Sequence, residues 1–231
     1  MFQTGNKTTL TPPESPKERL RAALDLAWEV TKAKFRDGQI RITKEAPLQH
    51  QYAQALNQLG DLFTTHRREI IRVDLERLES NLVTSGHDRY LDVVCELDSP
   101  QREEPLKAAV EMKFKPGSKG APQGSVQAMY DLYSLEVACN NDYDMGRLLI
   151  AANNKYYWQE PQNSEIRENF GIYQGRSIRS GDELVAETST AFGVLESKTQ
   201  NSRLSFQGNY EFDWNKVSSD FHFLSVAVDS P

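Results

Sequence analysis

The chain has 231 residues, of which 38% are hydrophobic and 26% charged, and its formal net charge is −6. This composition suits one large globular domain, and the acidic balance argues against a nonspecific nucleic-acid coat protein while allowing a local basic cleft. No run approaches the roughly 18–20 apolar residues of a membrane-spanning helix, the first residues lack the apolar stretch of a secretory signal, and two cysteines exclude a disulfide framework. We therefore expect a cytoplasmic protein with no membrane association.

The first half of the chain predicts helices followed by strands. Residues 1–15 form a polar segment that we expect to be a disordered tail, and a single domain is expected over 16–231. Apolar residues recur at helical spacing over about 15–35, with Pro16 suited to the first turn, and again over 47–63. The stretch EIIRVDLERLES alternates apolar and charged residues, which indicates a strand, with a helix as the alternative.

The second half alternates between strand and helix patterns. RYLDVVCEL and LKAAVEMKF predict two strands, GSVQAMYDLYSLEVA predicts a helix with Ser125 as a candidate cap, and GRLLIAAN predicts a short buried strand. Beyond it the pattern predicts a β-rich C-terminal extension over about 180–231, with extended segments at 183–189, 203–213 and 220–228. The expected fold class is α/β or α+β, with a mixed central sheet flanked by helices.

The two central strands place charged residues on one face. Glu111 and Lys113 are two apart on a strand whose other face is apolar, because strand side chains alternate. If the hairpin is symmetric about the loop DSPQREEP, Asp92 lies opposite Glu111, with Cβ atoms about 5 Å apart. Facing carboxylates repel, so a divalent cation with a preference for hard oxygen ligands, Mg²⁺ or Mn²⁺, would resolve the conflict. A bulge in the hairpin would break this register.

Asp92, the tripeptide Glu111-Met112-Lys113 and a following helix that carries Gln127 together resemble the PD-(D/E)xK nuclease superfamily over about 48–153. The resemblance implies a restriction-endonuclease-like core in which Asp92 and Glu111 bind metal. It implies that Lys113 positions or deprotonates the attacking water. Gln127 is then the polar helix residue of the site, with Asp131 one turn later on the same side.

This sequence departs from the superfamily pattern in two places. The signature Pro-Asp is here Leu91-Asp92, and no glutamate lies within the helix predicted at 47–63. Glu45 just before that helix, or Glu69 after it, could supply the third acid. An E-x-K tripeptide also arises by chance about once in a chain of this length, and Glu196-Ser197-Lys198 is a second copy without a matching hairpin.

Candidate DNA contacts lie in two basic segments. The loop KPGSKGAPQG either approaches a phosphate backbone through Lys115 and Lys119 or is a plain connection, and Arg67 and Arg68 form a second basic pair. The trio at 156–158 (Tyr-Tyr-Trp) could stack on a base, although aromatic packing in the core is the commoner use. No P-loop, dinucleotide-binding fingerprint or serine-hydrolase elbow occurs, which excludes those enzyme classes.

The sequence predicts a Mg²⁺-dependent endonuclease of the restriction or defence type that hydrolyses double-stranded DNA, with Mn²⁺ able to substitute. A homodimer is the expectation that follows from the resemblance, since cutting two strands needs two sites. The competing hypothesis is a nuclease-like module that binds DNA or a protein without cleaving it. A purely structural protein, with Glu111 and Lys113 pointing into solvent, is the third.

Overall fold

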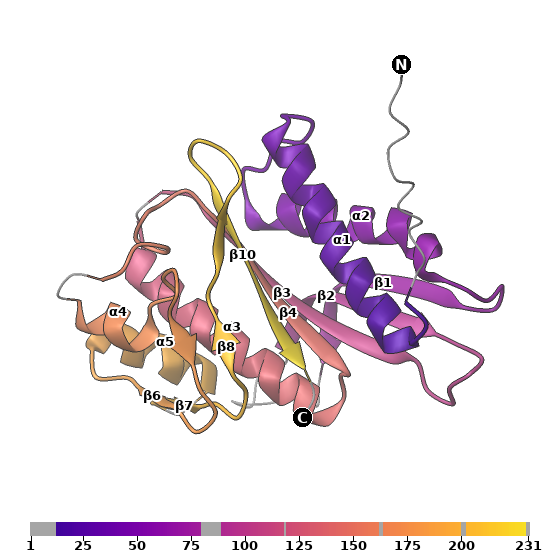
Figure 1. Cartoon of the computed structure of the whole chain (residues 1–231). Coiled ribbons are helices and arrows are strands. Elements are labelled where there is room, and N and C mark those ends of the chain that lie inside the picture. Colours follow the sequence, from indigo (N-terminus) through magenta and orange to yellow (C-terminus); the bar gives the residue numbers. More distant parts are fainter. Residues whose placement is uncertain (1–12, 80–88, 118, 162–163, 200–201, 230–231) are drawn as a thin grey trace, which may run out of the picture.

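The computed structural model describes residues 13–79, 89–117, 119–161, 164–199 and 202–229. Most of the predicted N-terminal tail therefore lies outside the described residues. A six-stranded mixed sheet lies between two layers of helices (Figure 1), which confirms the expected fold class. Among the described residues, no helix is both long and apolar enough to cross a bilayer.

Two N-terminal helices cover one face of the sheet. In α1 (Pro16–Arg36) the side chain of Ser15 accepts a hydrogen bond from the Glu18 N–H, and Pro16 occupies the first turn as predicted. Helix α2 (Glu45–Gly60) begins two residues earlier than expected and continues into the 3₁₀ turn η1 (Asp61–Phe63). Their apolar stripes pack on the sheet in one core that includes Leu20, Leu24, Trp28, Leu48, Tyr52, Leu56, Val93, Val110, Met112 and Phe223.

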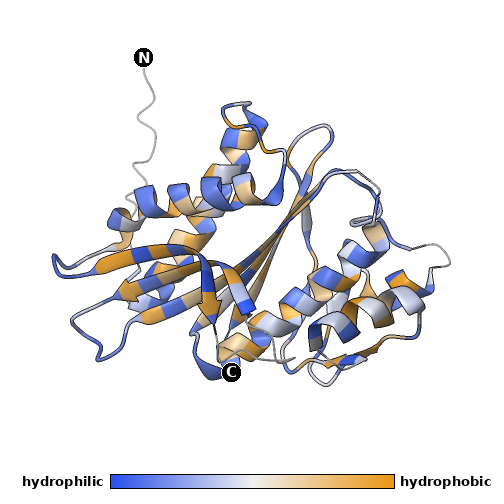
Figure 2. Ribbon diagram, turned by 180° about the vertical axis from the view of Figure 1, so that it is seen from behind, coloured by the Kyte–Doolittle hydropathy of each residue, from blue (hydrophilic) through white to orange (hydrophobic). Residues whose placement is uncertain are grey.

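The sheet has the strand order β1-β2-β3-β4-β10-β9. Its strands are β1 (Ile70–Glu79), β2 (Arg89–Asp98), β3 (Leu106–Lys115), β4 (Met145–Ala152), β9 (Trp214–Lys216) and β10 (His222–Asp229). Among the described strands, β3 and β4 are the one pair that runs parallel, and α3 (Ala121–Asn141) connects them across the second face. Burial on both faces explains why β4 is almost entirely apolar, and the colour of hydrophobic residues dominates the central strands in Figure 2.

Helix α3 begins earlier than its sequence pattern predicted. Its N-cap is Gly120, whose φ of 71° is the left-handed conformation that glycine adopts without strain. Ser125, the predicted cap, is instead a buried residue one turn inside the helix, so that prediction was wrong. The pattern failed because the helix starts in the Gly- and Pro-rich loop, where no side-chain cap is used.

The C-terminal third packs over α3 and also completes the sheet. It contains the short helices α4 (Glu165–Phe170) and α5 (Ser189–Thr199), which the sequence pattern missed, and the strand pairs β5 (Ser177–Ile178) with β8 (Tyr210–Glu211) and β6 (Glu183–Val185) with β7 (Arg203–Ser205). Strand β10 pairs with β4 along its whole length. This segment is therefore joined to the central sheet through β10.

Candidate active site

The candidate site lies where β2 and β3 separate. Their pairing follows the predicted register from Leu97–Leu106 to Val93–Val110, and the Asp92–Glu111 position lies just beyond this last pair. Beyond that point, β3 N–H groups bond to side-chain carboxylates instead of to the β2 backbone. Met112 N donates to Asp92 Oδ2 at 2.6 Å, and Phe114 N donates to Glu45 Oε2 at 3.1 Å. Both carboxylates are thus held by the backbone of the strand that carries Glu111 and Lys113.

Helix α3 closes over the polar face of β3. Glu111 is 3% exposed, and Asp131 from α3 faces it across the site. The Lys113 ammonium lies among four carboxylates, at 3.3 Å from Asp131, 3.5 Å from Glu45, 3.7 Å from Asp92 and 3.8 Å from Glu111. The expectation attached to the third hypothesis, that Glu111 and Lys113 point into solvent, is therefore wrong.

Arg89 is a second cation in the site, and the sequence reasoning missed it. Its Nη2 lies 2.9 Å from Glu111 Oε1 and 3.5 Å from Asp131 Oδ1, and its Nη1 donates to the Ser134 hydroxyl. Leu91 packs in the core under α3, whereas Val93 packs in the core under α1 and α2. Because alternate residues of a regular strand share a face, β2 must be irregular near Asp92. That irregularity turns Arg89 towards α3.

Charge in the site is unevenly balanced. Burial and the neighbouring Asp131 raise the pKa of Glu111 to about 8, although Arg89 and Lys113 act in the opposite direction. Burial also opposes the charge of Lys113, but the surrounding carboxylates outweigh it and raise its pKa well above the usual value. Lys113 is therefore a fixed positive charge at neutral pH. Glu111 carries a proton over much of the neutral range.

A small pocket of about 220 Å³ opens onto this cluster. It is lined by Glu45, Lys113, Lys115, Gln127, Tyr130, Asp131 and Lys198. Lys115 donates to Gln127 Oε1 at 3.3 Å, and burial together with Lys113 lowers the pKa of Lys115. Lys198, from the second E-x-K tripeptide, thus lies at the mouth of the site, while its partner Glu196 is an exposed residue of α5.

The structure brings Glu45 into the site and places Glu69 elsewhere. Glu45, the first residue of α2, contacts Lys113 and β3, so it is the candidate third acid. Glu69 forms a buried ion pair with Arg19 at 2.5 Å and accepts a hydrogen bond from Ser99 at 3.1 Å. Glu69 lies just before β1. The residue of β1 that lies opposite Asp92 is Glu76, roughly 20 Å further along the strand than Glu69.

The residues predicted to contact DNA also lie in separate parts of the structure. Arg67 and Arg68 are exposed beside Glu69, at the far end of the sheet, whereas Lys119 is exposed in the loop before α3. Within the aromatic trio, Tyr157 is buried and the other two residues pack against the same core. Their packing matches the commoner use expected for the trio.

The donor set fits a hard divalent cation, although Lys113 already occupies the centre of the cluster. Carboxylate oxygens are the ligands that Mg²⁺ prefers, and Asp92, Glu111, Glu45 and Asp131 supply them within 4 Å of one cation. Among the described residues, however, no three His, Cys, Asp or Glu side chains converge as a ready-made metal site. Metal binding would therefore require the Lys113 ammonium to move aside from these oxygens.

No protein-family model, curated protein or solved structure matches the chain. Its function is therefore inferred from its own residues.

Proposed function

We propose that the protein is a Mg²⁺-dependent endonuclease that hydrolyses phosphodiester bonds of DNA. The observation that carries the proposal is a buried lysine surrounded by four carboxylates at the separated end of a strand hairpin, beside an open pocket. Among the described residues, four carboxyl groups face only the two cations Lys113 and Arg89, so even with Glu111 protonated their charges are incompletely balanced. Such an excess of buried negative charge is costly for a purely structural cluster.

Each residue has a role that its contacts support. Asp92 and Glu45 are held by backbone N–H groups of β3, so their remaining lone pairs can take a cation without the side chains reorienting. Asp92 and Glu111 would hold the metal, with Glu45 as the third acid. A bound metal supplies charge neutralisation at the phosphate and lowers the pKa of water. Gln127 and Lys115 border the pocket where a phosphate would enter.

Lys113 acts in this proposal as a charged group rather than as a base. Its raised pKa means that it keeps its proton at neutral pH. It can therefore orient the attacking water through a hydrogen bond and stabilise the negative charge that develops on the phosphate. In the reaction, water adds to phosphorus and loses a proton, while the bond to the leaving sugar oxygen breaks and that oxygen gains a proton.

The proposal also specifies the substrate, the biological role, the oligomeric state and the cellular location. Double-stranded DNA, a restriction or defence role and a homodimer with one site per strand are the particular form that we propose, with Mn²⁺ able to replace Mg²⁺. A cytoplasmic location is proposed because both cysteines, Cys95 and Cys139, are buried and unpaired.

The test is cleavage of plasmid and phage DNA by purified protein with Mg²⁺, with Mn²⁺ and with EDTA. Asp92→Asn, Lys113→Met and Glu45→Gln are each expected to reduce the rate by at least about 100-fold, given the usual effect of removing such a group. Glu196→Gln is the matched control, because it alters the second E-x-K tripeptide at an exposed position. Discrete fragments would support site-specific cutting, whereas a smear would leave the nuclease and remove the restriction role.

A second candidate function is a nuclease-like module that binds DNA or a protein without cleavage. It is favoured by the way that Lys113 occupies the centre of the carboxylates and Arg89 pairs with Glu111. Wild-type protein that binds DNA equally with and without Mg²⁺, and cuts none of the substrates, would establish this second candidate and reject the first.

A further inference from the structure

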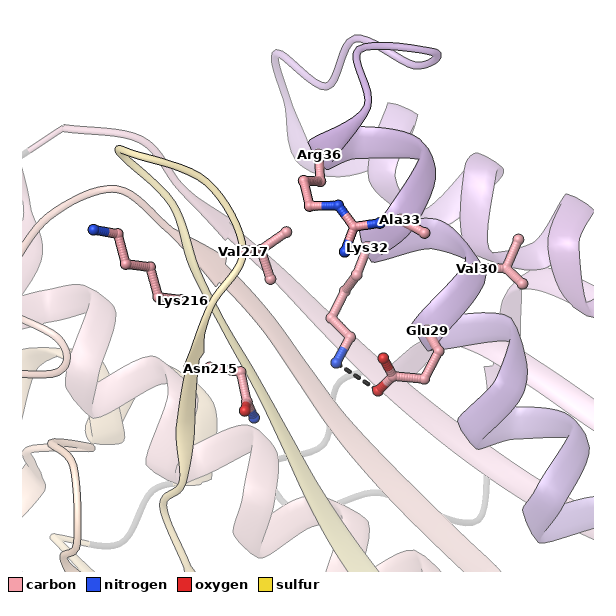
Figure 3. Close-up of a pocket in the computed structure, with 8 residues that line it drawn as sticks. All are labelled: Glu29, Val30, Lys32, Ala33, Arg36, Asn215, Lys216 and Val217. Carbon is pink, nitrogen blue, oxygen red and sulfur yellow. Dashed lines mark ion pairs between the residues drawn. The ribbon is translucent and has the colours of Figure 1, made fainter. Parts of the chain in front are cut away.

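Cation-lined hollows outside the candidate site differ in how far their charges are already balanced. The hollow between α1 and β9, about 470 Å³ and shown in Figure 3, contains Lys32 and Arg36. Lys32 lies 2.5 Å from Glu29, and Arg36 lies 2.9 Å from Asp37, so each already has an acidic partner. Figure 3 also shows the Lys216 side chain directed away from α1. This hollow therefore offers an anion little uncompensated charge.

The pocket at the start of α3 has the opposite balance. It has a volume of about 300 Å³ and is lined by Ala121, Pro122, Asn154, Lys155, Tyr156, Gln159 and Arg167. Among the described residues, none of those that line it is Asp or Glu. Within the described part of the chain, neither Lys155 nor Arg167 forms an ion pair with a carboxylate. We call it the Lys155 pocket.

Arg167 is held in place by neutral groups. Its Nη2 donates to the Gln159 carbonyl oxygen, and its guanidinium carbon lies 4.6 Å from the centre of the Tyr156 ring. Its Nε is buried and has no hydrogen-bond partner among the described residues. The guanidinium is thus positioned but its charge is not neutralised. Because Arg167 covers one face of Tyr156, the ring supports the cation rather than offering that face to a base.

The Lys155 pocket adjoins the candidate site along α3. Pro122 lines the former and Gln127 the latter, and five helical residues span roughly 7–8 Å. Gly124 lies between the two pockets. A Cβ atom added there would lie 3.4 Å from Lys115 and 2.4 Å from the Tyr157 hydroxyl, so α3, β3 and the loop that carries Tyr157 are in close contact here. This separation is short enough for nearby phosphates of one DNA strand to reach both pockets.

We propose that the Lys155 pocket binds a phosphate group through Lys155 and Arg167, and that this is a backbone phosphate of a DNA strand close to the one at the candidate site. The inference rests on the proposed function for the identity of the ligand, but the pocket's charge stands independently of it. An uncompensated Lys–Arg pair with a polar amide beside it matches phosphate chemistry, since a guanidinium can donate two parallel hydrogen bonds to phosphate oxygens. A contact of this kind fixes the register of the strand without reading its sequence.

The experiment measures binding of a fluorescent DNA duplex in EDTA at several salt concentrations, so that cleavage plays no part. Lys155→Ala and Arg167→Gln are compared with Lys32→Gln, which removes a cation that already has an acidic partner. Lys155 is exposed, so its replacement leaves the core intact, and glutamine at 167 can still donate to the Gln159 carbonyl. We expect each pocket variant to bind about tenfold more weakly and to lower the slope of log affinity against log salt by about one. Lys32→Gln should match the wild type.

A second arm tests inorganic phosphate by its protection of the folded protein against heat. If phosphate protects the wild type but not Lys155→Ala, and DNA does not bind, the pocket is a phosphate site for a small molecule and the DNA assignment is overturned. Equal DNA affinity and salt slope in Lys155→Ala and Lys32→Gln would overturn the inference even if the protein cleaves DNA. Conversely, selective loss of binding in the pocket variants without any Mg²⁺-dependent cleavage would support the pocket and reject the nuclease.

Discussion

Replacing Glu111 by glutamine is expected to stabilise the metal-free protein at alkaline pH, although it removes one member of a buried ion pair. In the folded protein the pKa of Glu111 rises from 4.5 to about 8, chiefly through burial and then through Asp131. The folded state therefore holds a proton that the unfolded chain releases. Glutamine has nearly the same shape as the protonated acid and never ionises.

The direction and size follow from proton linkage. A raised pKa in the folded state gives stability that is complete below pH 4.5 and is lost as the pH rises through about 8. The full loss for a carboxyl moved this far is roughly 5 kcal/mol, of which about 3 kcal/mol falls between pH 6 and 9. The free energy of unfolding of Glu111→Gln relative to the wild type should therefore increase by about 3 kcal/mol over that interval.

The assay is urea denaturation of both proteins in EDTA at half-unit steps from pH 6 to 9. Glu69→Gln is a control of opposite sign. Although burial favours the neutral acid, the backbone N–H groups of Thr65 and His66, the Ser99 hydroxyl and Arg19 together lower the pKa of Glu69. Its contribution is present above pH 4.5 and is lost only towards acid pH, so this variant should be destabilised to a constant extent from pH 6 to 9. A stability difference for Glu111→Gln that does not change with pH would refute the reasoning.

Magnesium and one further substitution test the charge of the site, and a second substitution tests its packing. Adding Mg²⁺ should raise the melting temperature of the wild type, and the rise should be larger at pH 8.5 than at pH 6.5 because carboxylate ligands must be deprotonated. In thermal scans, Glu111→Gln should show little or no such rise. Lys113→Met leaves the carboxylates facing one another and should cost about 3–5 kcal/mol, measured by urea denaturation, with part of the loss recovered in a Lys113→Met/Asp131→Asn double variant. Gly124→Ala should destabilise despite the higher helix propensity of alanine, because its Cβ would lie 2.4 Å from the Tyr157 hydroxyl; an equal loss in a Tyr157→Phe background would contradict this cause.

The elements that the sequence predicted well are those whose apolar residues alternate or recur over many positions. Helix α1 and strands β1 to β4 follow their patterns to within about a residue. Helix α1 and strands β2 to β4 do so because they bury one face or both, whereas β1 is only partly buried and keeps its alternation along its pairing with β2. Helices α4 and α5 are short, and α5 contains Gly193 and several hydroxyl residues, so neither has a periodic apolar stripe long enough to recognise. Their helical structure depends on packing against α3.

The candidate site was predictable where it depends on hairpin register and unpredictable where it depends on tertiary docking. Asp92, Glu111 and Lys113 could be related because both strands and their loop are contiguous in sequence. The choice between Glu45 and Glu69 depends on how the first turn of α2 meets β3, which no local pattern encodes. Arg89 could not be foreseen, because its direction follows from the irregularity in β2, opposite a Glu76 with a φ of 51°.

The pairing of β4 with β10 has a consequence for how this protein is made in the cell. Every residue of β4 is buried, and one of its two strand neighbours begins at His222, 70 positions after β4 ends at Ala152. During synthesis the ribosome therefore displays an apolar strand with an open edge until residues 222–229 have emerged. Such an edge readily pairs with other chains. Slow translation, or interruption anywhere between these two strands, should make the nascent chain dependent on chaperones and prone to aggregate.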